Sequence, residues 1–171
     1  VSGITASSKT YDGSVTATMD GTSAVYSGLV PGDTFTGSYT GVFANANVGS
    51  GKTVTITSTY SGADSGNYTV TDQSSTTADI SVKALTATAS TANKAYDGAT
   101  TATTTLTFTG LVGSETLGQT VGSTFDNKNV GSNKTVTVNS ITLADGSNGG
   151  LAANYSISAG QTTTADISAK S

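Results

Sequence analysis

The sequence predicts an all-β protein built from two tandem immunoglobulin-like antiparallel β-sandwich domains. Three observations lead to this expectation. Thr alternates with apolar residues along the 171-residue chain, Gly, Asn and Asp turn signals are frequent, and one sequence of about 85 residues occurs twice. Residues that favour exposed helix faces are scarce, whereas Thr and Ser make up about a third of the chain. The size and turn spacing of each copy fit a small sandwich.

Each copy is expected to hold six or seven short strands. The clearest covers 53–59, where Val54 and Ile56 alternate with threonines as in a strand with one buried face. A ubiquitin-like β-grasp is the alternative fold, but no stretch supports its long helix; at most one helical turn is expected, near 28–33 or 110–115. The other expected strands share short length and turn-rich flanks: 35–43, 67–70, 77–82, 86–90, 103–109 and 117–125.

The two copies share four blocks in the same order. These are a Lys-x-Tyr-Asp-Gly run, a Gly-Leu-Val turn followed by an acid, a Phe and Asn-Val-Gly before a Thr/Val strand, and an Asn-Tyr pair before a closing Ala-Asp-Ile strand. We therefore expect two domains, 1–83 and 84–171, joined without a flexible linker. The motif residues, for which a structural role is expected, are Tyr11, Asp12, Gly13, Asn67 and Tyr68, repeated as Tyr96, Asp97, Gly98, Asn154 and Tyr155.

Offsets between the blocks locate the length differences between the copies. They indicate three extra residues near Asp20 in the first copy and five around 145–150 in the second, both in turn-forming sequence. Lys83 and Lys170 occupy matching places, so a third copy is expected to follow in a longer parent array.

The composition argues against most enzyme chemistry. The chain has no His, Cys or Trp, and Glu115 is its only glutamate. Without His there is no default general base near neutral pH, no Ser/His/Asp triad and no ordinary zinc site. Charged residues make up 11% of the chain, the formal net charge is −4, and no basic cluster or long apolar run occurs. We expect a non-enzymatic protein that neither binds nucleic acid nor inserts into a membrane.

The ordered and duplicated motifs resemble the YDG repeat, a relative of the glycine-rich MBG repeats of large secreted bacterial adhesins, including filamentous-haemagglutinin-like proteins. The resemblance covers essentially the whole chain twice. It implies a monomeric spacer module at the bacterial cell surface or outside the cell, with neighbouring repeats of the same polypeptide as its partners. It brings no catalytic residues and no cofactor.

Two alternatives concern ligands of these motifs. Tyr-Asp-Gly could contact a sugar through ring stacking and the carboxylate, but a turn with Gly at positive φ explains the same residues. Calcium, the main cofactor candidate, needs six to eight oxygens with several carboxylates, and the acids here are scattered singly. A joint site that includes Asp79 is the arrangement left open.

A self-formed Lys–Asn amide bond is a further hypothesis, because residues of the required types repeat in both copies. A lysine on an early strand would lie beside an asparagine before a late strand, with a buried protonated acid assisting. The residues concerned are Lys9, Asn67 and Asp79 in the first copy, and Lys94, Asn154 and Asp166 in the second.

Three functions are compatible with the sequence. The first is a structural spacer that carries a binding domain away from the cell. The second is an adhesive module that binds a glycan or host protein through tip loops around 145–150 or 64–67. The third is matrix or biofilm assembly through exposed Thr-rich edge strands.

Overall fold

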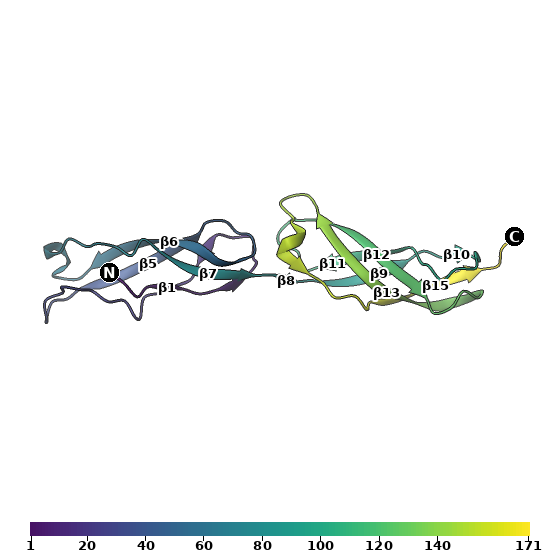
Figure 1. Cartoon of the computed structure of the whole chain (residues 1–171), viewed down its shortest axis with the longest axis horizontal. Helices are drawn as coiled ribbons and strands as arrows, with labels where there is room; N and C mark the ends of the chain where they lie inside the picture. Colours follow the sequence, from purple (N-terminus) through teal and green to yellow (C-terminus); the bar gives the residue numbers. More distant parts are fainter. The chain divides into compact units, whose positions relative to one another are not determined.

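The computed structural model describes residues 1–171 and divides into two compact units, Val1–Val82 and Lys83–Ser171 (Figure 1). The predicted boundary lies one residue further along the chain. Both units are all-β, which confirms the predicted fold class. Their only helical segments are two three-residue 3₁₀ turns, η1 (Ser65–Asn67) and η2 (Ala152–Asn154), so neither unit has the long helix of a β-grasp fold.

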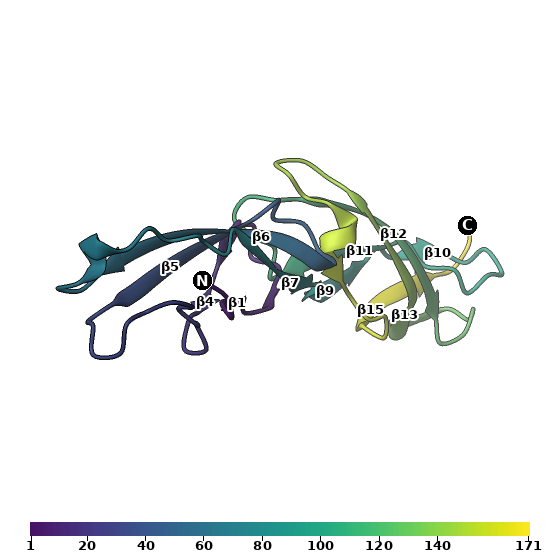
Figure 2. The same cartoon turned by 60° about the vertical axis from the view of Figure 1, so that its left-hand side comes forward.

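The first unit has one five-stranded sheet and one small two-stranded sheet. In the larger sheet β2 pairs in parallel with β7, and the remaining pairs are antiparallel. β5 and β6 lie side by side in both views (Figures 1 and 2). The order of the larger sheet is β2 (Lys9–Thr10), β7 (Ser75–Ser81), β6 (Gly49–Ser61), β5 (Thr36–Phe43) and β3 (Thr16–Ala17); β1 (Thr5–Ala6) and β4 (Met19–Asp20) form the smaller sheet.

The second unit repeats this plan with longer strands. Its four-stranded sheet again pairs an early strand in parallel with the last one, and two further two-stranded sheets complete it. The four-stranded order is β10 (Lys94–Ala95), β15 (Thr162–Ser168), β13 (Gly131–Asp145) and β12 (Leu117–Phe125); the two-stranded sheets are β9 (Thr86–Thr91) with β11 (Thr104–Thr109), and β8 (Lys83–Ala84) with β14 (Tyr155–Ser156).

Alternate residues of these strands form the two cores. In β6, Val54 and Ile56 are buried while the threonines beside them are exposed, as the alternation predicts. The matching residues of β13 are Val136 and Val138, also buried. Equivalent core positions in the two units are Phe43, Ala78 and Ile80 in the first and Phe125, Ala165 and Ile167 in the second.

One local prediction is wrong. Residues 67–70 were expected to form a strand, but Asn67 ends η1 and 68–74 belong to no strand; only the second unit has a short strand here, β14. The helical turn expected near 28–33 or 110–115 is a single hydrogen-bonded turn in each unit, in which Asp33 N donates to Val30 O at 3.2 Å and Glu115 N to Val112 O at 3.0 Å.

The extra residues of each copy are also placed by the structure. In the first unit, β4 stops at Asp20 and an isolated bridge between Ser2 and Val25 resumes the pairing beyond the insertion. In the second unit the five extra residues do not all lie in the 145–150 loop. The β12–β13 register shifts between Ser123–Val138 and Gly122–Ser140, so one extra residue, Asn139, forms a β-bulge.

Candidate functional site

The Lys-x-Tyr-Asp-Gly block of the first unit forms a lysine-centred turn. Lys9 Nζ donates to Asp12 Oδ1 at 2.8 Å, to Ser14 O at 2.8 Å and to Thr16 O at 3.0 Å, and lies 5.4 Å from the Phe43 ring centroid. Ser14 N donates back to Asp12 Oδ1 at 2.8 Å. Partial burial would raise the pKa of Asp12, but the bonds from Lys9 and Ser14 outweigh it and lower that pKa.

The second unit contains the same turn with nearly the same distances. Lys94 Nζ donates to Asp97 Oδ1 at 2.9 Å, to Ala99 O at 2.8 Å and to Thr101 O at 3.0 Å, and lies 5.5 Å from the Phe125 ring centroid. The hydrogen bond from Lys94 lowers the pKa of Asp97. The ammonium groups of both lysines are therefore engaged by their own turns.

The remaining residues of Tyr-Asp-Gly also have contacts within their own units. Tyr11 is buried at 4% exposure, and its N–H donates to Ser81 O at 2.9 Å; Tyr96 N donates to Ser168 O at the same distance. Gly13 and Gly98 have φ of 75° and 81°, a conformation that a Cβ disfavours. These contacts account for each residue of the motif without a ligand.

A second shared contact joins the Asn-Tyr block to the Gly-Leu-Val turn. In the first unit the Tyr68 hydroxyl donates to Asp33 Oδ2 at 2.5 Å and accepts from Val30 N at 3.1 Å. The hydrogen bond to Asp33 raises the pKa of the Tyr68 phenol, because it stabilises the protonated form. The paired blocks therefore form one structural unit: the tyrosine hydroxyl accepts a hydrogen bond from the turn, and the acid accepts a hydrogen bond from the hydroxyl.

The second unit makes the same contact in a more buried setting. The Tyr155 hydroxyl donates to Glu115 Oε2 at 2.6 Å and accepts from Val112 N at 2.9 Å. Tyr155 is 5% exposed, and burial followed by the bond to Glu115 raises its pKa. Glu115, the only glutamate, thus replaces Asp33 at a matching position.

The structure does not bring together the residues of the proposed Lys–Asn amide bond. Lys9 pairs with Ile80, which pairs with Gly49 at the start of β6, whereas Asn67 follows the other end of that strand. Thirteen residues of β6 separate the two ends by roughly 40 Å. The hypothesis is therefore wrong for this geometry, and the duplicated β10–β15–β13 pairing gives the same result for Lys94 and Asn154.

The acids do not gather into a metal-binding cluster. No group of three or more His, Cys, Asp or Glu side chains lies within reach of one cation. Asp79 Oδ1 accepts from Gly51 N at 2.7 Å, and its counterpart Asp166 Oδ1 accepts from Asn133 N at 2.8 Å. Both carboxylates thus bond the backbone at the register shift near the start of the long strand of their own unit.

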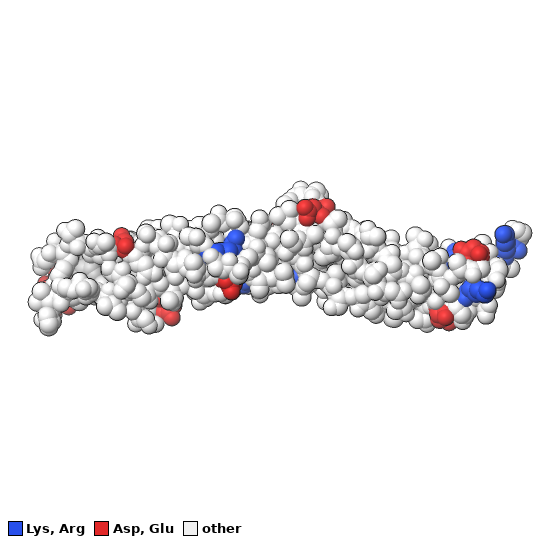
Figure 3. Space-filling view, in the orientation of Figure 1, with Lys and Arg blue, Asp and Glu red and all other residues white.

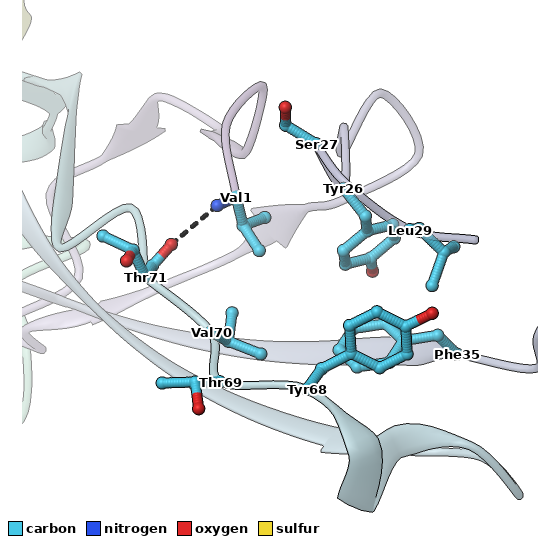
Figure 4. A pocket seen from close by; sticks show the side chains of 9 residues that line it. All are labelled: Val1, Tyr26, Ser27, Leu29, Phe35, Tyr68, Thr69, Val70 and Thr71. Carbon is cyan, nitrogen blue, oxygen red and sulfur yellow. Dashed lines mark hydrogen bonds between the residues drawn. The ribbon is translucent and has the colours of Figure 1, made fainter.

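The clearest hollow of the first unit is a cleft of about 240 Å³ with both polar and apolar lining. Figure 4 shows the rings of Tyr26, Phe35 and Tyr68 gathered on one side of it, with Val1 and Val70 opposite. Leu29, Ser27, Thr69 and Thr71 complete the lining. The loop at 64–67, one of the two proposed tip loops, lies directly before Tyr68 in the chain, but none of its own residues lines the cleft.

The other proposed tip loop, 145–150, is tied to its own unit. Thr116 Oγ1 and Ser147 Oγ lie 2.7 Å apart, Asn148 Nδ2 donates to Ser114 O at 3.0 Å, and Ala152 N donates to Asp145 Oδ1 at 2.8 Å. Its exposed side chains include no aromatic ring and no lysine.

Sequence reasoning missed the aromatic cluster beside the cleft. Phe35 stacks on Tyr60 with ring centroids 5.2 Å apart and meets Tyr26 and Tyr68 edge-on at 5.1 Å and 5.6 Å. Tyr26 and Tyr39 join their hydroxyls at 2.8 Å. The available signal was the unequal distribution of tyrosine, with five of the seven in the first copy.

The contacts that the duplicated motifs make define the class of protein. It is a tandem all-β repeat in which the motif residues stabilise turns. The YDG domain family model matches residues 1–78 and 81–165, so the chain belongs to the YDG domain family and carries two copies of the domain. No curated protein and no solved structure matches the chain. No helix is long and apolar enough to cross a membrane.

Proposed function

We propose that the two YDG domains are structural spacer repeats of a bacterial extracellular adhesin, which extend a binding domain from the cell surface. The observation that carries the proposal is the use of the repeated motif residues: in both domains the lysine, tyrosine and acid side chains hold turns of their own domain. Residues kept for a ligand would be expected to face a shared opening instead.

The joint between the domains supports the same proposal. β7 ends at Ser81 and β8 begins at Lys83, so only Val82 separates a strand of the first domain from a strand of the second. A long Gly/Ser linker would behave as a flexible coil, and none is present. Charged groups are also sparse: on the face shown in Figure 3 they form small separate groups among uncharged side chains.

Small-angle scattering of the chain and of a tandem duplication of it tests the spacer proposal. In the duplicated chain the first copy ends with Lys170 and Ser171, and one Leu is inserted before the next Val1, so that every boundary has the length of the Lys83-Ala84-Leu85 joint. A spacer array predicts that the maximum dimension increases by an equal step for each added domain. A chain with flexible joints would lengthen only with about the square root of domain number, and that outcome would contradict the proposal.

A second candidate is an adhesive domain that binds a glycan, favoured by the ring-lined cleft beside the 64–67 loop. Aromatic faces can stack on a sugar, and nearby acids, here Asp33 and Asp64, can accept hydrogen bonds from its hydroxyl groups. Retention on a glycan array, lost on Tyr26→Ala but kept in a Thr57→Ala control on the exposed face of β6, would support it. A spacer predicts no retention.

A further inference from the structure

The two YDG domains differ at one place that the shared motifs make directly comparable. In the second domain, Tyr155 and Ser156 pair in parallel with Lys83 and Ala84 of β8. Their counterparts in the first domain, Tyr68 and Thr69, belong to no strand and border the ring-lined cleft. One domain therefore has a paired strand where the other has an open groove.

In the second domain a strand and its leucine lie beside the matching residues. Leu85, which follows β8, is 5% exposed, and its N–H donates to Ser156 O at 2.7 Å. A Cβ placed on Gly110 of the Gly-Leu-Val turn would lie 3.6 Å from Leu85 Cδ2 and 3.7 Å from Ala84 O. The strand and its leucine thus lie against the same turn that Tyr155 holds.

The matching turn of the first domain has no such neighbour. A Cβ placed on Gly28 would meet no atom within 4 Å. Tyr68 is half-buried, whereas its counterpart Tyr155 is buried. The cleft of about 240 Å³ beside Tyr68 is lined by three rings and three aliphatic side chains together with polar groups, and a leucine side chain matches the ring and aliphatic part of that lining in chemistry.

The position of Val1 agrees with this comparison between the two domains. The Val1 amine donates to Thr71 O at 2.6 Å (Figure 4). By the repeat offsets, Val1 and Thr71 correspond to Thr86 and Ser158, two residues beyond the Ala84–Ser156 pair of the second domain. The chain at Val1 therefore lies beside the residue that a continuation of the Cα pairing of β8 with β14 would place there.

We propose that the cleft of the first YDG domain is a strand-acceptor site for an extended Val-Lys-Ala-Leu-type segment that immediately precedes the domain. The segment pairs in parallel with residues 68–69 and places its leucine in the cleft. The proposal rests on the proposed function in one respect only: the strand would come from the end of a preceding repeat. The joint is then a part of the following domain's fold rather than a tether.

An N-terminal extension of the full chain tests the site. Ser-Val-Lys-Ala-Leu, the sequence of 81–85, is placed directly before Val1, and a matched chain carries Ser-Val-Lys-Ala-Asp instead. The leucine extension is expected to raise the melting temperature of the first domain by several degrees. Parallel pairing uses alternate amides, so hydrogen exchange of Thr69 and Thr71 is expected to slow at least tenfold. The aspartate extension is expected to do neither.

A peptide in trans gives an independent measurement on the unextended chain. Acetyl-Ser-Val-Lys-Ala-Leu-amide is expected to shift the amide resonances of 68–71 saturably, and to lose this effect on the chain that carries the leucine extension. Equal melting and exchange of the two extended chains, with no peptide effect at 68–71, would overturn the site. Glycan binding in the cleft that persists in the leucine-extended chain would also overturn it. Either result leaves the scattering test of the spacer proposal unaffected.

Discussion

The two YDG domains share their motif contacts but differ in the strand pairing between the motifs. Both have the lysine-centred turn, the tyrosine-to-acid contact and the parallel pairing of an early strand with the last strand. Between these features, the second domain pairs β9 with β11 over six consecutive residue pairs, whereas the first pairs β1 with β4 over only two. The repeated motifs therefore make the same contacts in both domains, whereas the strand pairing between them tolerates alternatives.

The first domain compensates for its short β1–β4 pairing with aromatic side chains. The Tyr26 hydroxyl accepts from Gly37 N at 2.9 Å, and a Cβ at Gly37 would lie only 2.6 Å from that hydroxyl. At the counterpart of Gly37, the second domain has Gln119, whose amide pairs with Leu106 N and O at 3.0 Å and 2.8 Å. Aromatic packing at this position of the first domain is therefore replaced, in the second domain, by hydrogen bonds between a glutamine side chain and the backbone.

A smaller exchange occurs between β4 and β5. Met19 packs over Gly41, where a Cβ would lie 2.2 Å from the Met19 sulfur. The counterparts are Thr104 and Ser123, whose hydroxyls lie 2.7 Å apart. A large apolar side chain over a glycine has been exchanged for two small hydroxyl side chains that bond each other.

The largest expected effect tests whether the shared cores are energetically equivalent. Phe43→Ala and Phe125→Ala each remove a buried ring, at 2% and 3% exposure, and are expected to lower the free energy of unfolding of their own domain by about 3–5 kcal/mol. Hydrogen exchange resolved by domain is the measurement. A loss that spreads equally to both domains would contradict their independent cores.

The next effect concerns the Thr104–Ser123 pair. Thr104→Met is expected to destabilise the second domain by about 1–3 kcal/mol, because the longer side chain meets Ser123 and removes its hydroxyl partner. Adding Ser123→Gly, which recreates the Met-over-Gly arrangement, is expected to recover most of the loss. A double-mutant cycle measures the coupling, and additive losses would show that the exchange is not a matched pair.

Removing the tyrosine hydroxyls is expected to have a smaller and unequal effect. Tyr155→Phe should cost about 1–2 kcal/mol of unfolding free energy, because a buried bond to Glu115 and one from Val112 N are lost. Tyr68→Phe should cost less, since Tyr68 is half-buried. Chemical denaturation followed by domain-resolved exchange separates the two; an equal cost would show that burial does not distinguish them.

The same tyrosines predict an alkaline limit. Their pKa values are raised in the folded protein, so their stabilisation is complete below the unfolded value of about 10 and is lost as pH rises through the folded values. Both Phe variants should therefore show a weaker alkaline loss of stability than the parent chain.

The smallest expected effect concerns the exposed aspartates of the lysine turns. The pKa values of Asp12 and Asp97 are lowered, so their stabilisation is present above the unfolded value of about 3.9 and is lost as pH falls through the folded values. Asp12→Asn and Asp97→Asn should lower the melting temperature slightly at pH 7 and hardly at all at pH 2. An equal decrease at both pH values would indicate lost turn geometry rather than lost charge.

Sequence alone supplied the fold class, the duplication and most long strands, because alternation such as Thr53 to Thr59 directly reflects one buried face. It did not supply the partners of the motifs. Tyr68 and Asp33 are 35 residues apart, and no local pattern indicates that they meet. The bulge at Asn139 was also inaccessible, since register depends on pairing across strands.

The parallel pairing of early and last strands has a mechanical consequence. β2 is entered from the N-terminal side of its domain and β7 leaves on the C-terminal side, and they run in the same direction, with Tyr11 N continuing their contact to Ser81 O at 2.9 Å. Tension between the two ends pulls these strands along their axes in opposite directions, so their hydrogen bonds are loaded in shear together. β10 and β15, with the matching bond from Tyr96 N to Ser168 O, are loaded in the same way.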